Sequence, residues 1–438
     1  MIALIFKKSR IFIVFFLLFA YQKMAAAEIL LISLEDAVEH ALDSNLNLKK
    51  ILIDVSAADY QAQSLWAELF PSINATASAG YSSGLFSGNG FEFNESGASF
   101  TASLGLSLGL NAGTLYTARN IRLAYQNKLL TYDDACNQLE IQVTKSFFVL
   151  ITEKENLNVL EETYKLAVQQ LEKSQLGFNN GLVSELILTQ SKLALENARY
   201  NLNVARSLFD IHMGEFFALL GMEHDTEAVL EGKIALSRFD TDTEKLIRQY
   251  LPGRPDIVSR RQEIERMENI ERQLALTGRS PSLNLSLDWR SGSFNPFMDS
   301  LGGTATIRIP IDSWVPGTKG EQSIRIAKLA IDKAKLDLKI AENEAITQIR
   351  SLAANLRNSW DSIEIARLSL QAAERSYQLT EQGFLRGTIE YIKLEDARNN
   401  LVDIRQRLLR SELACQTAIL DISAALNIKW KELINDSQ

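Results

Sequence analysis

Apolar residues recur at steps of three, four or seven along two long tracts of the chain. In the first tract they are Val143, Phe147, Leu150, Leu157, Tyr164, Leu171 and Phe178. This spacing puts them on one face of a helix and is typical of a coiled-coil seam. None of the seven prolines, which would break a helix, lies between Ser72 and Leu251. The pattern predicts long helices over about residues 115–176 and 183–220.

The second tract repeats the first at an offset of 206 residues. Its apolar positions are Ile349, Ala353, Leu356, Ile363, Leu370, Tyr377 and Phe384. The segment Gly177–Leu182 also recurs, as Gly383–Thr388. A shared frame over this distance indicates that the chain contains two copies of one unit. The buried face of an ordinary helix bundle would give the same stripe, and the duplication does not exclude it.

Four shorter segments alternate between apolar and polar residues, which is the period of a β-strand. They span about residues 72–83, 98–111, 282–291 and 303–311. Each is close to the ~9–11 residues that a tilted strand needs to cross a bilayer. A soluble sheet with one wet face is the alternative. The long loops at one end of each strand pair, rich in Gly, Ser and Asn, favour strands in an outer membrane.

Four strands are too few to enclose a pore, because the smallest outer-membrane barrels have ~8 strands. Open strand edges are not tolerated in lipid, so we expect several chains to share one barrel. A single-chain passive porin would consist mostly of strands, unlike this sequence. A periplasmic coiled-coil scaffold without a pore would leave the four alternating segments with no lipid to face.

The predicted fold is mainly α with a small β part and a twofold internal repeat. Its parts are a signal peptide at 1–27, a first repeat at 28–221, a linker or equatorial subdomain at 222–250, a second repeat at 251–426 and a tail at 427–438. A capping box at residues 33–36 opens a helix that is expected to run to about Phe70. In the second repeat, helices are expected to about Thr277 and over about 319–382 and 389–426.

The amino terminus has the features of a secretory signal peptide. Lys7, Lys8 and Arg10 precede the apolar segment 11–20, and small residues at 25–27 offer a cleavage site. Removal of the four basic residues of this segment would change the formal net charge from −8 to −12. Such an acidic chain is not expected to bind nucleic acid. Export would permit a disulfide, yet two unpaired thiols at Cys136 and Cys415 are the favoured interpretation.

No residue set predicts catalytic, cofactor or metal chemistry. The segment Gly80–Gly84 matches G-x-S-x-G but lies at the loop end of a strand, whereas a nucleophile elbow needs a strand, a turn and a helix. The three histidines, His40, His212 and His224, lack the spacing of metal ligands. The segment Pro316–Lys319 lacks Walker spacing. A hydrolase is therefore a distant alternative, and energy for any transport would have to come from a partner.

The order and spacing of several short motifs resemble the outer-membrane efflux proteins of the TolC family. These motifs are the paired strands of each repeat, the opening Arg254-Pro255-Asp256 of the second repeat, and the turns at Gly181-Leu182-Val183 and Gly387-Thr388. The resemblance covers essentially the whole mature chain. Each motif is short, and their combination makes the resemblance specific.

The resemblance implies a homotrimer in the bacterial outer membrane, with a long periplasmic extension. Three protomers would form one twelve-stranded barrel above a long coiled-coil barrel of helices. The implied function is the channel component of a tripartite efflux or type I secretion system. The implied partners are a periplasmic adaptor (membrane fusion) protein, an inner-membrane transporter and outer-membrane lipid. The cargo, and whether the pump uses ATP or protons, stay open.

The resemblance also implies which residues dock the adaptor and which close the entrance. The adaptor would dock at the hairpin turns, through Asn180, Gly181, Leu182, Arg386, Gly387 and Thr388. The family's entrance aromatic, turn arginine and two aspartates match Phe384, Ile389, Lys393 and Asp396. Only one of the two acids is therefore kept. We expect Lys393 to pair with an acid such as Asp396 or Glu185 across the closed entrance, although an ordinary solvated i,i+3 pair would look the same.

Overall fold

The computed structural model of the chain describes residues 30–82, 97–223, 228–232, 242–291 and 299–430. The predicted signal peptide, most of both predicted loops and the last eight residues lie outside these ranges. The chain forms two compact units, which cut across the two sequence repeats. We call residues 50–134 and 248–347 the strand unit, and residues 30–49, 135–247 and 348–430 the hairpin unit. The repeat boundaries inferred from the sequence stay predictions.

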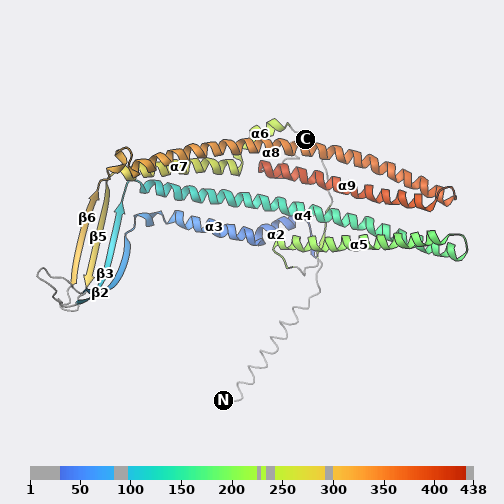
Figure 1. The fold of residues 1–438 in the computed structure, drawn as a ribbon, viewed down its shortest axis with the longest axis horizontal. Helices are drawn as coiled ribbons and strands as arrows, with labels where there is room; N and C mark the ends of the chain where they lie inside the picture. Colours follow the sequence, from blue (N-terminus) through green and yellow to red (C-terminus); the bar gives the residue numbers. More distant parts are fainter. Residues whose placement is uncertain (1–29, 83–96, 224–227, 233–241, 292–298, 431–438) are drawn as a thin grey trace, which may run out of the picture. The chain divides into compact units, whose positions relative to one another are not determined.

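The strand unit contains a four-stranded antiparallel sheet in the order β2-β3-β5-β6 (Figure 1). Its strands are β2 (Ser72–Ser82), β3 (Gly97–Leu110), β5 (Ser282–Ser291) and β6 (Asp299–Arg308). The two repeats meet in the middle, where Leu106 of β3 pairs with Leu287 of β5. Because paired residues share a face, the register collects the apolar residues of all four strands on one face and the polar residues on the other.

The last strand differs from the prediction of residues 303–311. It begins at Asp299, which pairs with Ser291, and it ends at Arg308. The alternating pattern continues to Ile311, but Pro310 has no N–H to donate to a neighbouring strand. A short 3-10 helix, η4 (Asp312–Trp314), follows instead.

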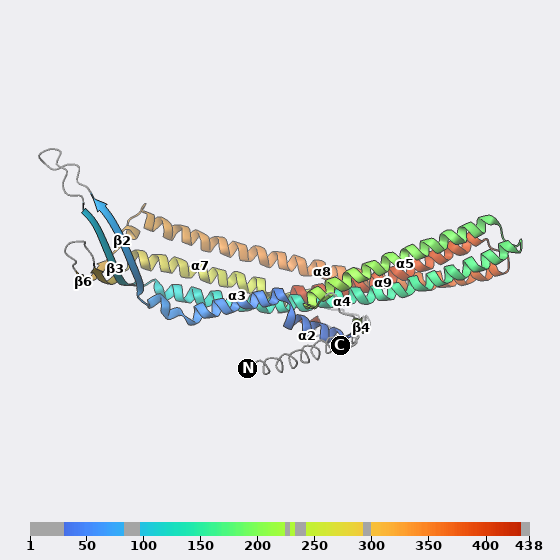
Figure 2. The same cartoon turned by 90° about the horizontal axis from the view of Figure 1, so that it is seen from below.

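The helices of the strand unit connect to the sheet at one end (Figure 2). They are α3 (Leu46–Gln63), η2 (Leu65–Leu69), η3 (Leu251–Gly253), α7 (Pro255–Arg279) and the first parts of α4 (Thr114–Asn179) and α8 (Lys319–Leu385). Ser313 of η4 is buried beside Gly278 of α7 and Gly320 of α8. A Cβ at either glycine would collide with the Ser313 side chain, so both glycines are required for this close approach.

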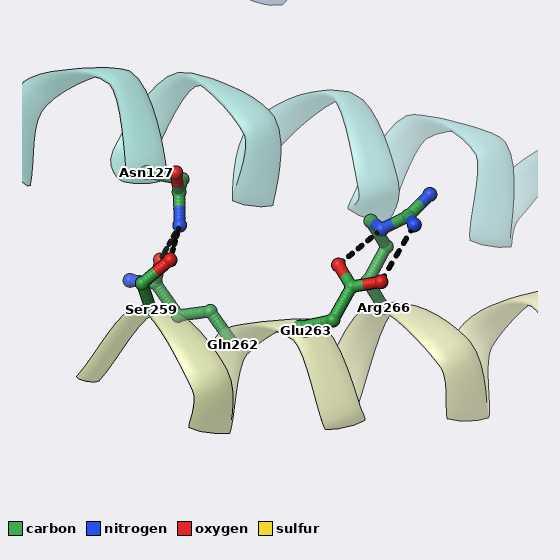
Figure 3. Close-up of polar contacts among 5 residues, drawn as sticks. All are labelled: Asn127, Ser259, Gln262, Glu263 and Arg266. Carbon is green, nitrogen blue, oxygen red and sulfur yellow. Dashed lines mark hydrogen bonds and ion pairs between the residues drawn. The ribbon is translucent and has the colours of Figure 1, made fainter. Parts of the chain in front are cut away.

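Polar side chains join α4 to α7 within the strand unit (Figure 3). The Asn127 amide donates hydrogen bonds to Ser259 Oγ at 2.8 Å and to Gln262 Oε1 at 3.0 Å. One turn further along α7, Arg266 and Glu263 form two parallel hydrogen bonds, both of 2.7 Å. This hydrogen-bonded carboxylate raises the pKa of the Arg266 guanidinium. The Asn127 amide thus links α4 to α7 through two hydrogen bonds.

The expected single helix from residue 34 to Phe70 is in fact broken. The capping box is present, since Ser33 Oγ accepts from the Asp36 N–H at 3.2 Å and Asp36 accepts from the Ser33 N–H at 3.3 Å. Helix α2 (Leu34–Ser44) nevertheless stops at Asn45. The Asn45 side chain accepts from the amides of the next helix and donates to the Leu219 carbonyl at 2.8 Å. This residue therefore ends one helix and caps the next, as asparagine often does.

The hairpin unit contains a small parallel strand pair that the sequence did not predict. Strand β1 (Leu30–Ile32) pairs with β4 (Ala228–Leu230) from the expected linker, which also contributes helix α6 (Thr243–Tyr250). Three residues per strand are too few for a periodic signal. The core beside this pair contains Phe147 and Phe216, both 1% exposed.

Two long helical hairpins make up the rest of the hairpin unit. Helix α4 turns into α5 (Glu185–Leu220), and α8 turns into α9 (Tyr391–Leu426). Both second helices end on a left-handed residue at the same repeat position, Gly221 with φ 75° and Asn427 with φ 54°. The predicted seam is buried at its start, where Val143 and Ile349 are 0% and 1% exposed. In the part of the chain that the structure describes, no helix is both long and apolar enough to cross a membrane.

Candidate functional site at the hairpin tips

The two hairpins turn in the same way at the same end of the hairpin unit (Figures 1 and 2). Gly181 and Gly387 adopt φ values of 73° and 75°, a left-handed conformation that favours glycine. The amide of Leu182 donates to the Gly177 carbonyl at 2.8 Å, and Thr388 donates to Gly383 at 2.9 Å. These backbone bonds close the last turn of each first helix, as in a Schellman motif. The turns are thus two copies of one structure.

A second glycine in each hairpin lets the chain return close to the helix it has left. A Cβ at Gly177 would lie 2.5 Å from Val183 Cγ2, and a Cβ at Gly383 would lie 2.5 Å from Ile389 Cδ1. Glycine is needed at both positions because no Cβ tolerates such a distance. Ile389, predicted at the entrance, therefore packs against its own hairpin.

The predicted docking residues form the exposed surface of both turns. Asn180, Gly181, Leu182, Arg386, Gly387 and Thr388 are all exposed. In the first turn Leu182 is 81% exposed, and in the second turn Leu385, next to Arg386, is 75% exposed. Both values are high for leucine. Each tip therefore presents an exposed leucine within two residues of a left-handed glycine, a surface that a partner helix could approach closely.

Of the four predicted entrance residues, Phe384 and Ile389 pack against their own hairpin, whereas Lys393 and Asp396 are exposed. Phe384 is half-buried and its ring lies 6.0 Å from that of Tyr391, centroid to centroid. Lys393 and Asp396 are both exposed on the first turns of α9. Within the described residues of this single chain, no ion pair joins Lys393 to Asp396 or to Glu185. The pairing of Lys393 across a closed entrance stays a prediction, because it would involve other copies of the chain.

Tyr391, which the sequence did not single out, is the first residue of α9 and is buried against the first hairpin. It is 4% exposed, and its hydroxyl makes no hydrogen bond of good geometry. Burial raises the pKa of Tyr391 to about 12, since the phenolate would lose its hydration, and the nearby Ser191 hydroxyl opposes this shift. Tyr391 therefore anchors the second hairpin to the first as an uncharged aromatic residue.

Arg398 and Glu395 form a buried ion pair one to two turns further along α9. Their side chains are 9% and 14% exposed, and Arg398 donates to Glu395 Oε2 at 2.6 Å. The Arg398 Nε is buried without a hydrogen-bond partner. A buried guanidinium with an unused donor lowers the stability of the folded chain.

Arg398 lies between two open spaces in the hairpin unit. A groove of about 880 Å³ runs between α5 and α9 over α4, lined by Leu160, Ala198 and Tyr391 among others. A smaller space of about 420 Å³ lies between α4, α8 and α9 and includes Tyr377. Burial and the neighbouring Glu381 raise the pKa of the Tyr377 hydroxyl. Packing between the two hairpins is therefore incomplete near their tips.

Polar bridges join α4 to α9 further from the tips. Gln406 donates to Asn156 at 3.0 Å, and Arg405 forms ion pairs with Glu162 at 3.0 Å and Glu374 at 3.8 Å. A further ion pair joins Lys145 to Asp421. These partly exposed polar contacts between α4 and α9 add to the buried contact of Tyr391 with the first hairpin.

A signal for the missed residues was present in the sequence. Tyr391, Leu394, Arg398 and Leu401 follow a coiled-coil spacing along α9, and all four are buried. An arginine at a seam position is unusual. This position could have been recognised from its spacing alone.

Similarity to known proteins extends over most of the chain. The sequence model of the family described as "Outer membrane efflux protein" matches residues 37–221 and 246–427. The chain is 24% identical over 428 residues to the probable efflux pump outer membrane protein TtgC of Pseudomonas putida, covering 91% of this chain and 84% of the relative. It is 23% identical over 309 residues to the outer membrane protein TolC of Vibrio cholerae, covering 68% and 69%.

Solved structures show the same fold. The CmeC outer membrane channel of Campylobacter jejuni superposes with a TM-score of 0.74 at 20% identity, covering 92% of this chain and 89% of that one. The match extends over both units, so the sheet and the two helical hairpins are shared features.

Proposed function

The chain belongs to the outer membrane efflux protein family, and we propose that three copies of it form one continuous export duct. The protein is an outer-membrane efflux channel component whose helices extend into the periplasm. The porin and scaffold interpretations are set aside by this membership. Three sheets would build the membrane part of the duct, and the second hairpin of each copy would close its entrance.

The observation that carries the proposal is the four-stranded sheet with two open edges. Strands β2 and β6 each have one unpaired side, and such edges are not tolerated in lipid. The apolar face carries exposed side chains such as Ile73, Tyr81, Leu301 and Ile307. Three sheets joined edge to edge would close a barrel of twelve strands with this face towards lipid.

Native mass spectrometry of the purified full chain in detergent tests the assembly. We expect a single species of three copies that survives mild activation. A monomer, or a closed assembly of another number, would contradict the proposed duct.

The hairpin tips are the proposed contact with a periplasmic adaptor, which would link the duct to an inner-membrane pump. Family membership implies such partners in general. Support for the tips as their site comes from the exposed Leu182 and Leu385 beside left-handed glycines.

Photo-crosslinking in cells tests this contact. A crosslinking amino acid at Asn180 or Arg386 is expected to capture a periplasmic adaptor protein. The same amino acid at Asn203, exposed in the middle of α5, is the matched control. Equal capture from all three positions would refute a tip-specific site.

The second hairpin is the proposed gate of the duct. Phe384 and Ile389 would shape the constriction, and Lys393 and Asp396 would each contribute a ring of three charges. Support comes from the exposure of both charges on the first turns of α9 and from the incomplete packing around this hairpin. Single-channel recording of Lys393→Ala tests this assignment, and a more conductive channel is expected.

A further inference from the structure

The polar face of the sheet carries almost no charge. Along the described strands its residues are serine, threonine, asparagine and glycine, except at Asp288, Arg290 and Arg308. Barrels with a polar interior turn this face towards the lumen. Arg308 lies at the end of its strand, next to the helices. Asp288 and Arg290 are therefore the charges that lie well inside the sheet.

Asp288 stands between two glycines. It pairs with Gly105 of β3 on one side and Gly302 of β6 on the other. A Cβ at Gly105 would lie 2.9 Å from Oδ1 of Asp288, so the carboxylate leans over that glycine. Nothing lies within 4 Å of a Cβ added at Gly302. The two glycines leave room for the carboxylate and do not cover it.

Arg290 lies in the next row of the same face, towards the loop end of the sheet. Its partners there are Ser103 and Ser300, again small residues, and the Arg290 side chain is exposed. Successive rows on one face of a strand are ~7 Å apart. The two charges are thus stacked along the strand direction, with opposite sign.

We propose that Asp288 and Arg290 set the ion selectivity of the channel inside the barrel, as two stacked rings of opposite charge. The inference rests on the proposed trimeric barrel, in which each residue occurs three times around the lumen. The Asp288 ring favours cations and the Arg290 ring favours anions. Selectivity for charged cargo would then be decided in the strand unit as well as at the hairpin tips.

The size of the effect depends on screening by salt. The Debye length is ~10 Å at 0.1 M salt and ~3 Å at 1 M. Charges on the wall of a lumen act on ions within about one Debye length, so the two rings influence passing ions more at low salt than at high salt. We expect removal of one ring to change the cation-to-anion permeability ratio about twofold at 0.1 M.

Reversal potentials of single channels in planar bilayers, measured across a KCl gradient, test the proposal with the full chain. Asp288→Asn is expected to lower the ratio of K⁺ to Cl⁻ permeability about twofold, and Arg290→Gln to raise it similarly. Asn74→Ser changes an uncharged residue in the row of Asp288 and is the matched control. Both shifts should shrink in 1 M KCl.

The outcomes separate the inference from the proposed function. Conducting channels whose ratio is unchanged in both variants, or changes as much in Asn74→Ser, would overturn the charge rings and leave the duct intact. A wild-type chain that forms no channel would overturn the duct itself. If the Asp288→Asn chain does not insert into the bilayer, the test depends on Arg290→Gln. An unchanged ratio of K⁺ to Cl⁻ permeability in that variant would refute the proposal.

Discussion

The tips of the two hairpins share a backbone but differ in what they bury. At equivalent positions, offset by 206 residues, Glu185 and Lys192 of α5 are exposed, whereas Tyr391 and Arg398 of α9 are buried. The turns, the glycines and the left-handed helix ends are the same in both copies. Both copies therefore keep the hairpin, but at these two positions the helix face that is exposed in the first copy is buried in the second.

This difference suggests a division of labour. At these positions the first hairpin has Glu185 and Lys192 in contact with water, where charges cost little and contribute little to stability. The second holds a cation, a carboxylate and a phenol inside an incompletely packed region, where small movements change their hydration. A gate needs such a region, since a tightly packed core resists displacement.

Among the changes that test this comparison, Arg398→Ala is expected to cause the largest loss of stability. Removing the cation leaves the Glu395 carboxylate buried without its partner, which typically costs ~3 kcal/mol or more. Lys192→Ala, at the equivalent exposed position, should change stability by less than ~0.5 kcal/mol. Hydrogen exchange of the α9 amides measures both variants. Equal protection in the two would show that the burial difference has no energetic consequence.

The free energy of unfolding is expected to fall at high pH. The folded-state pKa of Tyr391, about 12, lies above the ordinary value of 10, so its contribution is fully present below pH 10 and is lost as the pH rises towards 12. Cys415, whose pKa burial raises to about 11, adds a similar loss that begins near pH 9. Thermal unfolding from pH 8 to 12 measures the decline. It should become shallower in Tyr391→Phe, and Tyr200→Phe, at an exposed site of α5, should not alter it.

A smaller effect is expected from Lys393→Ala at the proposed gate. An exposed ion pair contributes at most ~1 kcal/mol, so its loss would shift the closed-to-open ratio by about fivefold or less. Single-channel conductance or open probability should therefore rise. Ile187→Ala, the equivalent change in the first hairpin, is the control. An unchanged Lys393→Ala channel would remove this residue from the gate.

The smallest effect is expected from Arg405→Gln. Its ion pairs with Glu162 and Glu374 are partly exposed, so their loss should lower stability by less than ~1 kcal/mol. Unfolding midpoints in urea at low and high salt measure this. A loss that is large and independent of salt would mean that the bridge is a buried anchor like Arg398.

Much of this architecture could be predicted from local patterns. The seam from Val143 to Phe178, the four alternating segments and the two glycine turns each depend on residues near one another in sequence, so periodicity revealed them. The break at Asn45 and the early end of β6 were missed. In both cases one residue, an asparagine that caps a new helix or a proline without an N–H, outweighed a continuing pattern.

The sequence by itself determined the duplication, the long helices, the two-faced strands and the exposed tips. Only the tertiary structure decided that β3 pairs with β5, that Tyr391 and Arg398 are buried while their counterparts are not, and that Asp288 stands between two glycines. The physical reason is one of range. Periodicity and turn chemistry act within a few residues, whereas burial and cross-strand neighbours depend on segments that can lie far apart in sequence, as Gly105 and Asp288 do.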